Sequence, residues 1–256
     1  MTSLLVERDA GVVTATMNRP HRRNALDLDM MGRLKDLLEE VHDTSTDRVL
    51  VLTGAGGAFC SGSDLDDRKN DPRHPLERLR WIGKIALGLQ QLGKPVIAKV
   101  EGAAVGGGLA LALGCDLIIA SSEARLGTAW TQRALSPDLG AAWLLPRMIG
   151  LHRAKELVFL GEMLTANEAL AMGLINRVVP APELDAAVRD WARNLALGPP
   201  LALSMSKSLL VEGMNASMAQ VLESEARALA VNIQSADGLE AMDAFKSKRA
   251  PVFQGR

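Results

Sequence analysis

The chain has 256 residues and a formal net charge of −1, and 48% of its residues are hydrophobic. This length allows one sizeable core, and the apolar content excludes a chain that is disordered throughout. With four Trp, four Phe, no Tyr and a near-neutral charge, the sequence lacks the basic surface and the stacking rings of a nucleic-acid-binding protein.

The sequence also predicts a cytoplasmic protein that neither crosses nor binds a membrane. It begins Met-Thr-Ser-Leu-Leu, which is neither basic nor followed by a long apolar core, so we expect no signal peptide. Asp116 interrupts the longest apolar run, which is then too short to span a bilayer. Cys60 and Cys115 cannot form a disulfide framework, and the four histidines have no metal-ligand spacing. We therefore expect no metal site.

Short apolar strands alternate with helical patterns, which is typical of an α/β protein. The spacing of Leu34, Leu37, Leu38 and Val41 predicts a helix. A second helix is expected over Gly106–Gly114. Strands are expected at residues 12–17, 48–53, 96–100, 117–120 and 177–179.

The character of the chain changes after Gly198-Pro-Pro200, where helical spacing recurs over residues 205–211, 218–231 and 239–245. We therefore divide it into a core, residues 1–198, and a helical C-terminal region, residues 199–256. Residues 64–75 are charged and interrupted by proline, and we expect them to form a mobile surface loop.

The glycine cluster at residues 106–108 follows an apolar strand and precedes a helix of small residues. The first N–H groups of a helix have no intrahelical partner and lie at the positive end of its dipole. Such a turn can hold an oxyanion, and glycine permits a ligand to approach the backbone closely. The alternative is a tight turn packed under another element.

Several segments together resemble the crotonase superfamily, the enoyl-CoA hydratase/isomerase family. The resemblance covers essentially the whole chain. It is carried, in family order, by Asn18-Arg-Pro20, Arg23-Asn-Ala-Leu26, Ala58-Phe-Cys-Ser-Gly-Ser-Asp-Leu65, Lys94-Pro-Val-Ile-Ala98, Glu101-Gly-Ala-Ala-Val-Gly-Gly-Gly108, Cys115-Asp116, Ala169 and Gly173-Leu-Ile-Asn176.

The resemblance implies an α/β crotonase (ClpP-like) fold, a spiral of ββα units with a C-terminal helical region that builds a homotrimer or a dimer of trimers. It also implies an acyl-CoA thioester substrate and no cofactor beyond the coenzyme A of that substrate. By position, the backbone N–H groups of Ser63 and Gly107 would hold the thioester oxygen. Removing one such donor costs roughly 3 kcal/mol in a comparable site.

The same resemblance places the substrate along two segments and the glycine turn. Arg22, Arg23 and Lys248 are candidate phosphate partners, and the adenine end would lie near Phe245 of a neighbouring subunit. The expected substrate-binding residues are Arg22, Ala25, Leu26, Ser63, Asp64, Leu65, Asp66, Gly107, Ala110 and Trp130.

The chain departs from the family hydratases at two positions. Those enzymes use a pair of glutamates, and the corresponding residues are Ala110 and Trp130. Hydration needs one group to activate water and another to supply a proton. The missing pair therefore argues against efficient hydration of the family type.

Asp138 is the remaining candidate acid/base. Read without the family, an Asp after Pro137 and before an apolar run is most simply the N-cap of the next helix. Family branches that lack the glutamates carry a catalytic aspartate at this position. The sequence around Asp138 looks most like that of the ring 1,2-epoxyphenylacetyl-CoA isomerase branch. One carboxylate suffices to shift a double bond, because it can remove a proton and return it elsewhere.

We therefore predict an enoyl-CoA isomerase, with enoyl-CoA hydratase as the alternative. A CoA-ester binder without turnover is a second class. The spacing of Trp130 and Asp138 also matches aryl-CoA dehalogenase, but the histidine that this branch needs corresponds to Gly83. Trp130 is expected to form a wall of the acyl pocket or to belong to the core.

Overall fold

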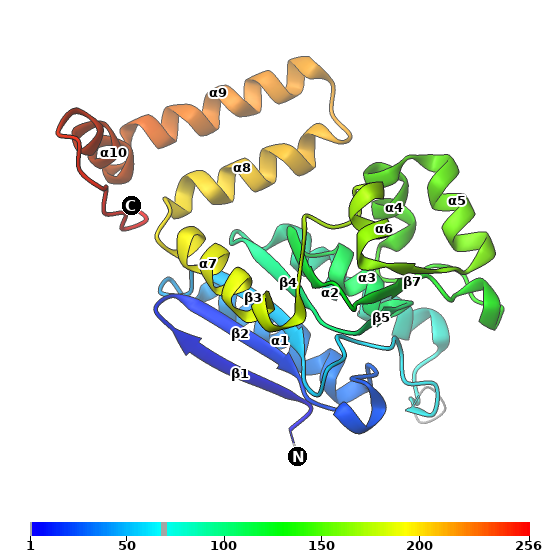
Figure 1. Ribbon diagram of the computed structural model, residues 1–256. Coiled ribbons are helices and arrows are strands. Elements are labelled where there is room, and N and C mark those ends of the chain that lie inside the picture. The colour runs from blue at the N-terminus through cyan, green and yellow to red at the C-terminus, as the bar shows by residue number, and fades with distance from the viewer. Residues whose placement is uncertain (1, 68–70) are drawn as a thin grey trace.

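The structure is a computed structural model that describes residues 2–67 and 71–256. Within these residues, a six-stranded sheet has the strand order β1-β2-β3-β4-β6-β9, in which only the β1–β2 pair is antiparallel. A smaller sheet has the order β5-β7-β8. Figure 1 shows this α/β core with a separate helical arm at the C-terminal end.

The strands are β1 (Leu4–Asp9), β2 (Val12–Met17), β3 (Val49–Gly54), β4 (Val96–Val100), β5 (Ala103–Val105), β6 (Leu117–Ser121), β7 (Arg125–Gly127), β8 (Met163–Thr165) and β9 (Arg177–Val179). The helices of the core are α1 (Leu28–Asp43), α2 (Pro75–Gln91), α3 (Gly107–Leu113), α4 (Ala141–Ile149), α5 (Leu151–Leu160), α6 (Ala166–Met172) and α7 (Leu184–Ala196). The arm consists of α8 (Pro200–Gly213), α9 (Met218–Gln234) and α10 (Ala236–Lys246). Short 3-10 turns lie at Pro20–Arg22, Thr131–Arg133 and Ala181–Glu183.

Strands β3 and β4 of the large sheet are buried on both faces, whereas the edge strand β1 is exposed beyond Leu4. Successive side chains of a strand point to opposite faces of the sheet. On β3, Val49 and Val51 face a small core formed with α7. Leu50 and Leu52 face the main core, which includes residues of α1, α2 and α3. Helix α7 therefore covers one face of the sheet, and the glycine-turn helix α3 lies on the other.

Isolated bridges connect the loop after β3 to two other segments. Leu26 pairs with Ser63, and Cys60 pairs with Ala104 of β5. Both pairs are parallel. Cys60 and Cys115 are buried and free, and burial raises the pKa of Cys60 to about 12. These bridges place residues 61–66 beside the glycine turn that follows β5.

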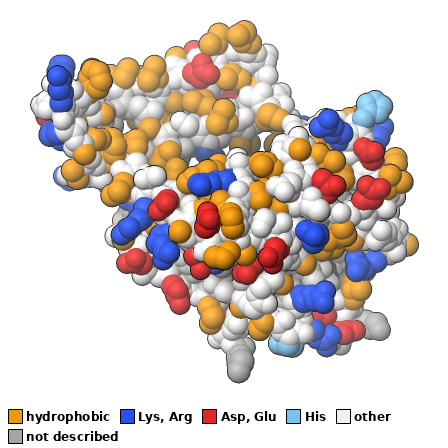
Figure 2. Space-filling view, in the orientation of Figure 1, with side chains coloured by type: hydrophobic (Ala, Val, Ile, Leu, Met, Phe, Trp, Pro, Cys, Tyr) orange, Lys and Arg blue, Asp and Glu red, His pale blue; other side chains and the backbone are white. Residues whose placement is uncertain are grey.

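The helical arm exposes many apolar side chains, which gather along it in Figure 2. They include Met218, Leu229, Ile233, Met242 and Phe245, the last of which is 82% exposed. Lys207 on α8 connects the arm to the core, since its ammonium donates to the carbonyls of Leu89 and Lys94 and pairs with Asp116 at 2.8 Å.

The structure confirms the expected strands, and three of them, β2, β4 and β9, have the predicted ends. It adds a short strand, β5, between β4 and the glycine turn, so the turn belongs to the edge of the small sheet. Most of the expected loop at 64–75 is described, and Pro75 begins α2. Its residues 68–70 lie outside the described residues.

Candidate functional site

The glycine turn opens into a cavity of about 770 Å³. Three segments of the loop regions meet there: residues 61–66, residues 106–107 and residues 129–139, with α2 as a fourth wall. The apolar part of the lining consists of Ala25, Leu65, Leu79, Ile82, Ala129, Trp130, Leu135, Pro137 and Leu139. The cavity thus combines an aliphatic wall with backbone groups of the two predicted oxyanion segments.

The N–H group of Ser63 points away from Leu26. In the Leu26–Ser63 bridge, Leu26 donates to the carbonyl of Gly62 and accepts from the N–H of Asp64. A parallel pair of this kind uses the groups that flank the bridged residue, so the N–H of Ser63 itself lies on the opposite side. Within the described part of the chain, this N–H has no backbone acceptor.

The N–H group of Gly107 belongs to the first residue of α3 and precedes the first intrahelical bond, which runs from Ala110 to Gly106. Gly106 has φ +54°, a conformation that side-chain-bearing residues rarely adopt. Its own N–H donates to Gly127. The turn is thereby fixed to the small sheet while the helix N-terminus faces the cavity.

The Ser63 and Gly107 segments approach one another closely at the cavity. A Cβ placed on Gly107 would lie 3.7 Å from the Ser63 nitrogen, and one placed on Gly62 would lie 3.6 Å from the Gly107 nitrogen. This is the close approach that glycine permits. An oxygen that enters the cavity here could accept from both amides, and the positive end of α3 would stabilise negative charge on it.

Asp138 lies in the cavity lining next to Trp130. The indole Nε1 of Trp130 donates to Oδ1 of Asp138 at 3.0 Å, and Trp130 is 4% exposed. A Cβ placed on Gly107 would lie 3.5 Å from the side chain of Leu139, the residue after Asp138. The carboxylate is therefore held by a neutral donor on the same cavity as the two amides.

The expectation that Asp138 is a helix N-cap is wrong. Helix α4 begins at Ala141 with Gly140 as its N-cap, and no side chain caps it. Leu139 and Ala129, on either side of the Trp130–Asp138 pair, have φ of +48° and +41°. Such left-handed non-glycine residues carry strain that gathers at functional sites, and here they turn the pair toward the cavity.

The opposite wall carries acidic side chains paired with arginine. Asp66 pairs with Arg22 at 3.4 Å, and Arg73 holds the pKa of Asp71 below its usual range. Burial raises the pKa of Asp64, but the hydrogen bond and charge of Arg19, together with the backbone N–H groups of Asp66 and Asp67, outweigh burial, so the pKa is lowered. These ion-paired groups belong to the same cavity lining as Trp130 and Asp138.

The structure brings most of the predicted residues to this one cavity. Its lining includes Arg22, Ala25, Ser63, Asp64, Leu65, Asp66, Gly107, Trp130 and Asp138. Leu26 and Ala110 are each 1% exposed and lie behind the lining, so their side chains support the wall. Lys248 and Phe245 lie on the C-terminal arm, outside the cavity of this chain.

The sequence analysis missed the wall that α2 contributes, including Leu79 and Ile82. The buried residues Ile82, Ile85 and Leu89 recur at helical spacing and could have revealed it. Over the residues that the structure describes, no cluster of His, Cys, Asp or Glu could hold a metal ion. In the same residues, no helix is long and apolar enough to cross a membrane.

Comparison with known proteins shows the family of the chain. The sequence model of one family, described as Enoyl-CoA hydratase/isomerase, matches residues 7–256. The chain belongs to the enoyl-CoA hydratase/isomerase family. It is 38% identical over 261 residues to the 1,2-epoxyphenylacetyl-CoA isomerase of Escherichia coli K12, and the match covers 100% of both chains.

Relatives of this enoyl-CoA hydratase/isomerase family member also include named hydratases. The short-chain-enoyl-CoA hydratase of Clostridium acetobutylicum is 33% identical over 251 residues, with 97% of this chain and 96% of the relative covered. The crystal structure of the enoyl-CoA hydratase from Bacillus anthracis superposes with a TM-score of 0.95 at 34% identity, and the match covers 99% of this chain and 100% of that one. The chain is therefore an enzyme of this family with the crotonase fold.

Proposed function

We propose that the protein shifts the double bond of an enoyl-CoA thioester, with Asp138 as the acid/base and the N–H groups of Ser63 and Gly107 as oxyanion donors. The observation that carries the proposal is the 3.0 Å hydrogen bond from Trp130 to Asp138. It holds one carboxylate on the cavity that the two amides face. By resemblance, the two glutamate positions of the hydratases correspond to Ala110 and to Trp130 itself.

The reaction requires one proton to move between two carbons. Asp138 removes a proton from the carbon next to the thioester of a 3-enoyl-CoA, and the electrons shift onto the thioester oxygen. The amides of Ser63 and Gly107 stabilise this enolate. Protonated Asp138 then returns the proton to the distal carbon, which leaves the 2-enoyl isomer and the original carboxylate. No water is added, so a second acid/base group is unnecessary.

The test is incubation with a 3-enoyl-CoA and with crotonyl-CoA in deuterated water, followed by mass spectrometry and NMR. We expect conversion of the 3-enoyl-CoA to the 2-enoyl isomer with deuterium uptake. Asp138→Asn keeps an oxygen for the Trp130 donor but cannot carry the proton, and should lower turnover by about a hundredfold or more. Asp190→Asn, on α7 across the sheet, is the matched control and should have no effect.

Hydration is the alternative, and relatives named hydratases share the fold. A hydratase would transfer oxygen from labelled water to crotonyl-CoA, whereas an isomerase exchanges only hydrogen. Efficient hydration that survives Asp138→Asn would refute the proposal. Binding of both esters without turnover would instead indicate a CoA-ester binder.

A further inference from the structure

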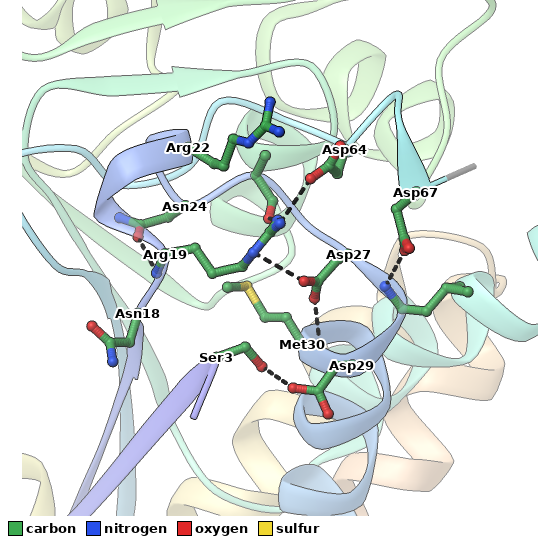
Figure 3. A network of polar contacts seen from close by, with 12 residues as sticks. Ser3, Asn18, Arg19, Arg22, Asn24, Asp27, Asp29, Met30, Asp64 and Asp67 are labelled. Carbon is green, nitrogen blue, oxygen red and sulfur yellow. Dashed lines mark hydrogen bonds and ion pairs between the residues drawn. The ribbon is translucent and has the colours of Figure 1, made fainter. Parts of the chain in front are cut away.

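The guanidinium of Arg19 contacts three partners behind the cavity wall, as Figure 3 shows in part. Its Nε pairs with Asp27 at 2.9 Å, its Nη2 with Asp64 at 2.9 Å, and its Nη1 donates to the carbonyl of Ala25 at 2.6 Å. The side chain is 16% exposed, and the Asp64 side chain is 8% exposed. Arg19 is absent from the cavity lining, so it does not face the proposed substrate.

These contacts join the two sides of the bridge that orients Ser63. Ala25 precedes the bridged residue Leu26, and Asp64 follows Ser63. Arg19 therefore binds one backbone carbonyl on the first segment and one side chain on the second. The direction of the Ser63 N–H depends on this bridge, because the bridge uses the flanking groups and leaves that N–H toward the cavity.

Hydrogen bonds also hold the backbone of Arg19 and its partner Asp27 in place. Asn24, which is fully buried, accepts from the N–H of Arg19 at 2.9 Å and donates to the carbonyls of Ala55 and Ala58. Asp27 also caps α1 by accepting from the N–H of Met30 at 2.8 Å. Figure 3 shows Arg19 between these two elements and the loop that carries Asp64. The guanidinium thus fixes the loop relative to α1. The backbone of Arg19 is fixed, through Asn24, to the segment that follows β3.

We propose that Arg19 is a positioning residue that aims the Ser63 N–H at the thioester oxygen. This inference rests on the proposed role of Ser63. Only a planar guanidinium satisfies three acceptors in this fork, since the lysine ammonium is a compact point charge on a flexible stem. Without Arg19, the carboxylates of Asp27 and Asp64 would be left without their shared cation, and their repulsion would open the bridge.

The experiment uses butyryl-CoA, a saturated ester that cannot isomerise, labelled with carbon-13 at its thioester carbonyl. Infrared difference spectra of the bound ester report the hydrogen bonds that its oxygen accepts. We expect the carbonyl stretch to shift to lower frequency on binding to the unaltered protein. Arg19→Lys should lose at least half of that shift, and its kcat on a 3-enoyl-CoA should fall about ten- to a hundredfold with KM nearly unchanged.

Arg33→Met is the matched control, because Arg33 forms an exposed ion pair with Asp29 on α1 and lies outside the cavity lining. It should keep the full shift and the full kcat. Asp64→Asn supplies a second variant that removes the ion pair with a nearly isosteric side chain, so the test stands if Arg19→Lys does not fold. It should lose part of the shift as well.

The outcomes separate this inference from the proposed function. If Arg19→Lys or Asp64→Asn binds the ester with the full shift and unchanged kcat, Arg19 does not position the donor. If the unaltered protein shows the shift but no isomerisation, the proposed reaction fails and the spectra of the variants still decide the role of Arg19. If the unaltered protein binds the ester without a shift, the oxyanion role of Ser63 and the role of Arg19 fail together.

Discussion

Trp130 donates its indole N–H to the carboxylate of Asp138 across eight residues of chain. The strained backbone at Ala129 and Leu139 flanks the pair. The indole hydrogen bond orients the carboxylate within the cavity lining. A carboxylate held in a fixed orientation beside the two amides is suited to proton transfer.

Trp130→Phe should lower kcat about tenfold with a smaller change in KM, because the carboxylate loses its orienting donor. The measurement is steady-state kinetics on a 3-enoyl-CoA. Trp191→Phe, on α7, is the control, and an unchanged kcat of Trp130→Phe would contradict the orienting role.

Gly107→Ala should fold but lose activity by about a hundredfold. Its Cβ would meet only Leu139 and Ser63 at 3.5 Å or more, which is ordinary contact, yet it would occupy the space between the two amides. Activity assays together with thermal unfolding measure the two effects separately. A stable Gly107→Ala variant with full turnover would remove the oxyanion assignment.

Gly108→Ala should instead destabilise the protein, by about 3 kcal/mol. Its Cβ would lie 2.2 Å from the carbonyl oxygen of Cys60, where the loop and α3 are in direct backbone contact. Chemical unfolding is the measurement. Gly83→Ala, in α2 with nothing within 4 Å of the new Cβ, is the control and should be neutral or slightly stabilising.

Lys207→Met should destabilise the protein by about 1 kcal/mol near pH 7, because it leaves Asp116, whose side chain is 25% exposed, without its cation. Burial raises the pKa of Asp116, and Lys207 opposes that rise. An acid with a raised folded pKa destabilises the fold increasingly as pH rises through the interval between its unfolded and folded values. Without Lys207 the folded pKa rises further.

The loss of stability in Lys207→Met should therefore be larger near pH 7 than near pH 4, where Asp116 becomes protonated. Urea unfolding at the two pH values measures it. Adding Asp116→Asn to Lys207→Met should recover part of the stability near pH 7, because no unpaired carboxylate then remains. Lys155→Met, an exposed change on α5, is the control, and equal losses for the two lysine variants would contradict the ion-pair argument.

The apolar side chains on the arm predict self-association. An exposed apolar face of this kind is typical of an interface. The resemblance to the family implies a homotrimer or a dimer of trimers, so light scattering should give a mass three or six times the 27.3 kDa of one chain. Ile233→Glu together with Phe245→Glu should shift the mass toward the single chain, as both residues are exposed. Glu225→Gln, also exposed on α9, is the control. A single-chain mass for the unaltered protein would refute the prediction.

The sequence by itself determined the α/β class, the main strands and the glycine turn that carries one proposed amide donor, because strand periodicity and glycine turns are local properties. It also identified Asp138 as a candidate, through the resemblance to the family. It predicted the arm as helical, and the ends of β2, β4 and β9 followed from their bounded apolar runs.

Only the tertiary structure decided what these residues do together. Asp138 looked like a helix cap because its local sequence favours one, and long-range packing instead turned it toward the indole of Trp130. The three-way binding of Arg19 joins residues up to 45 positions apart. Local patterns cannot specify such contacts, because they depend on how the bridges and sheets bring distant segments to one cavity.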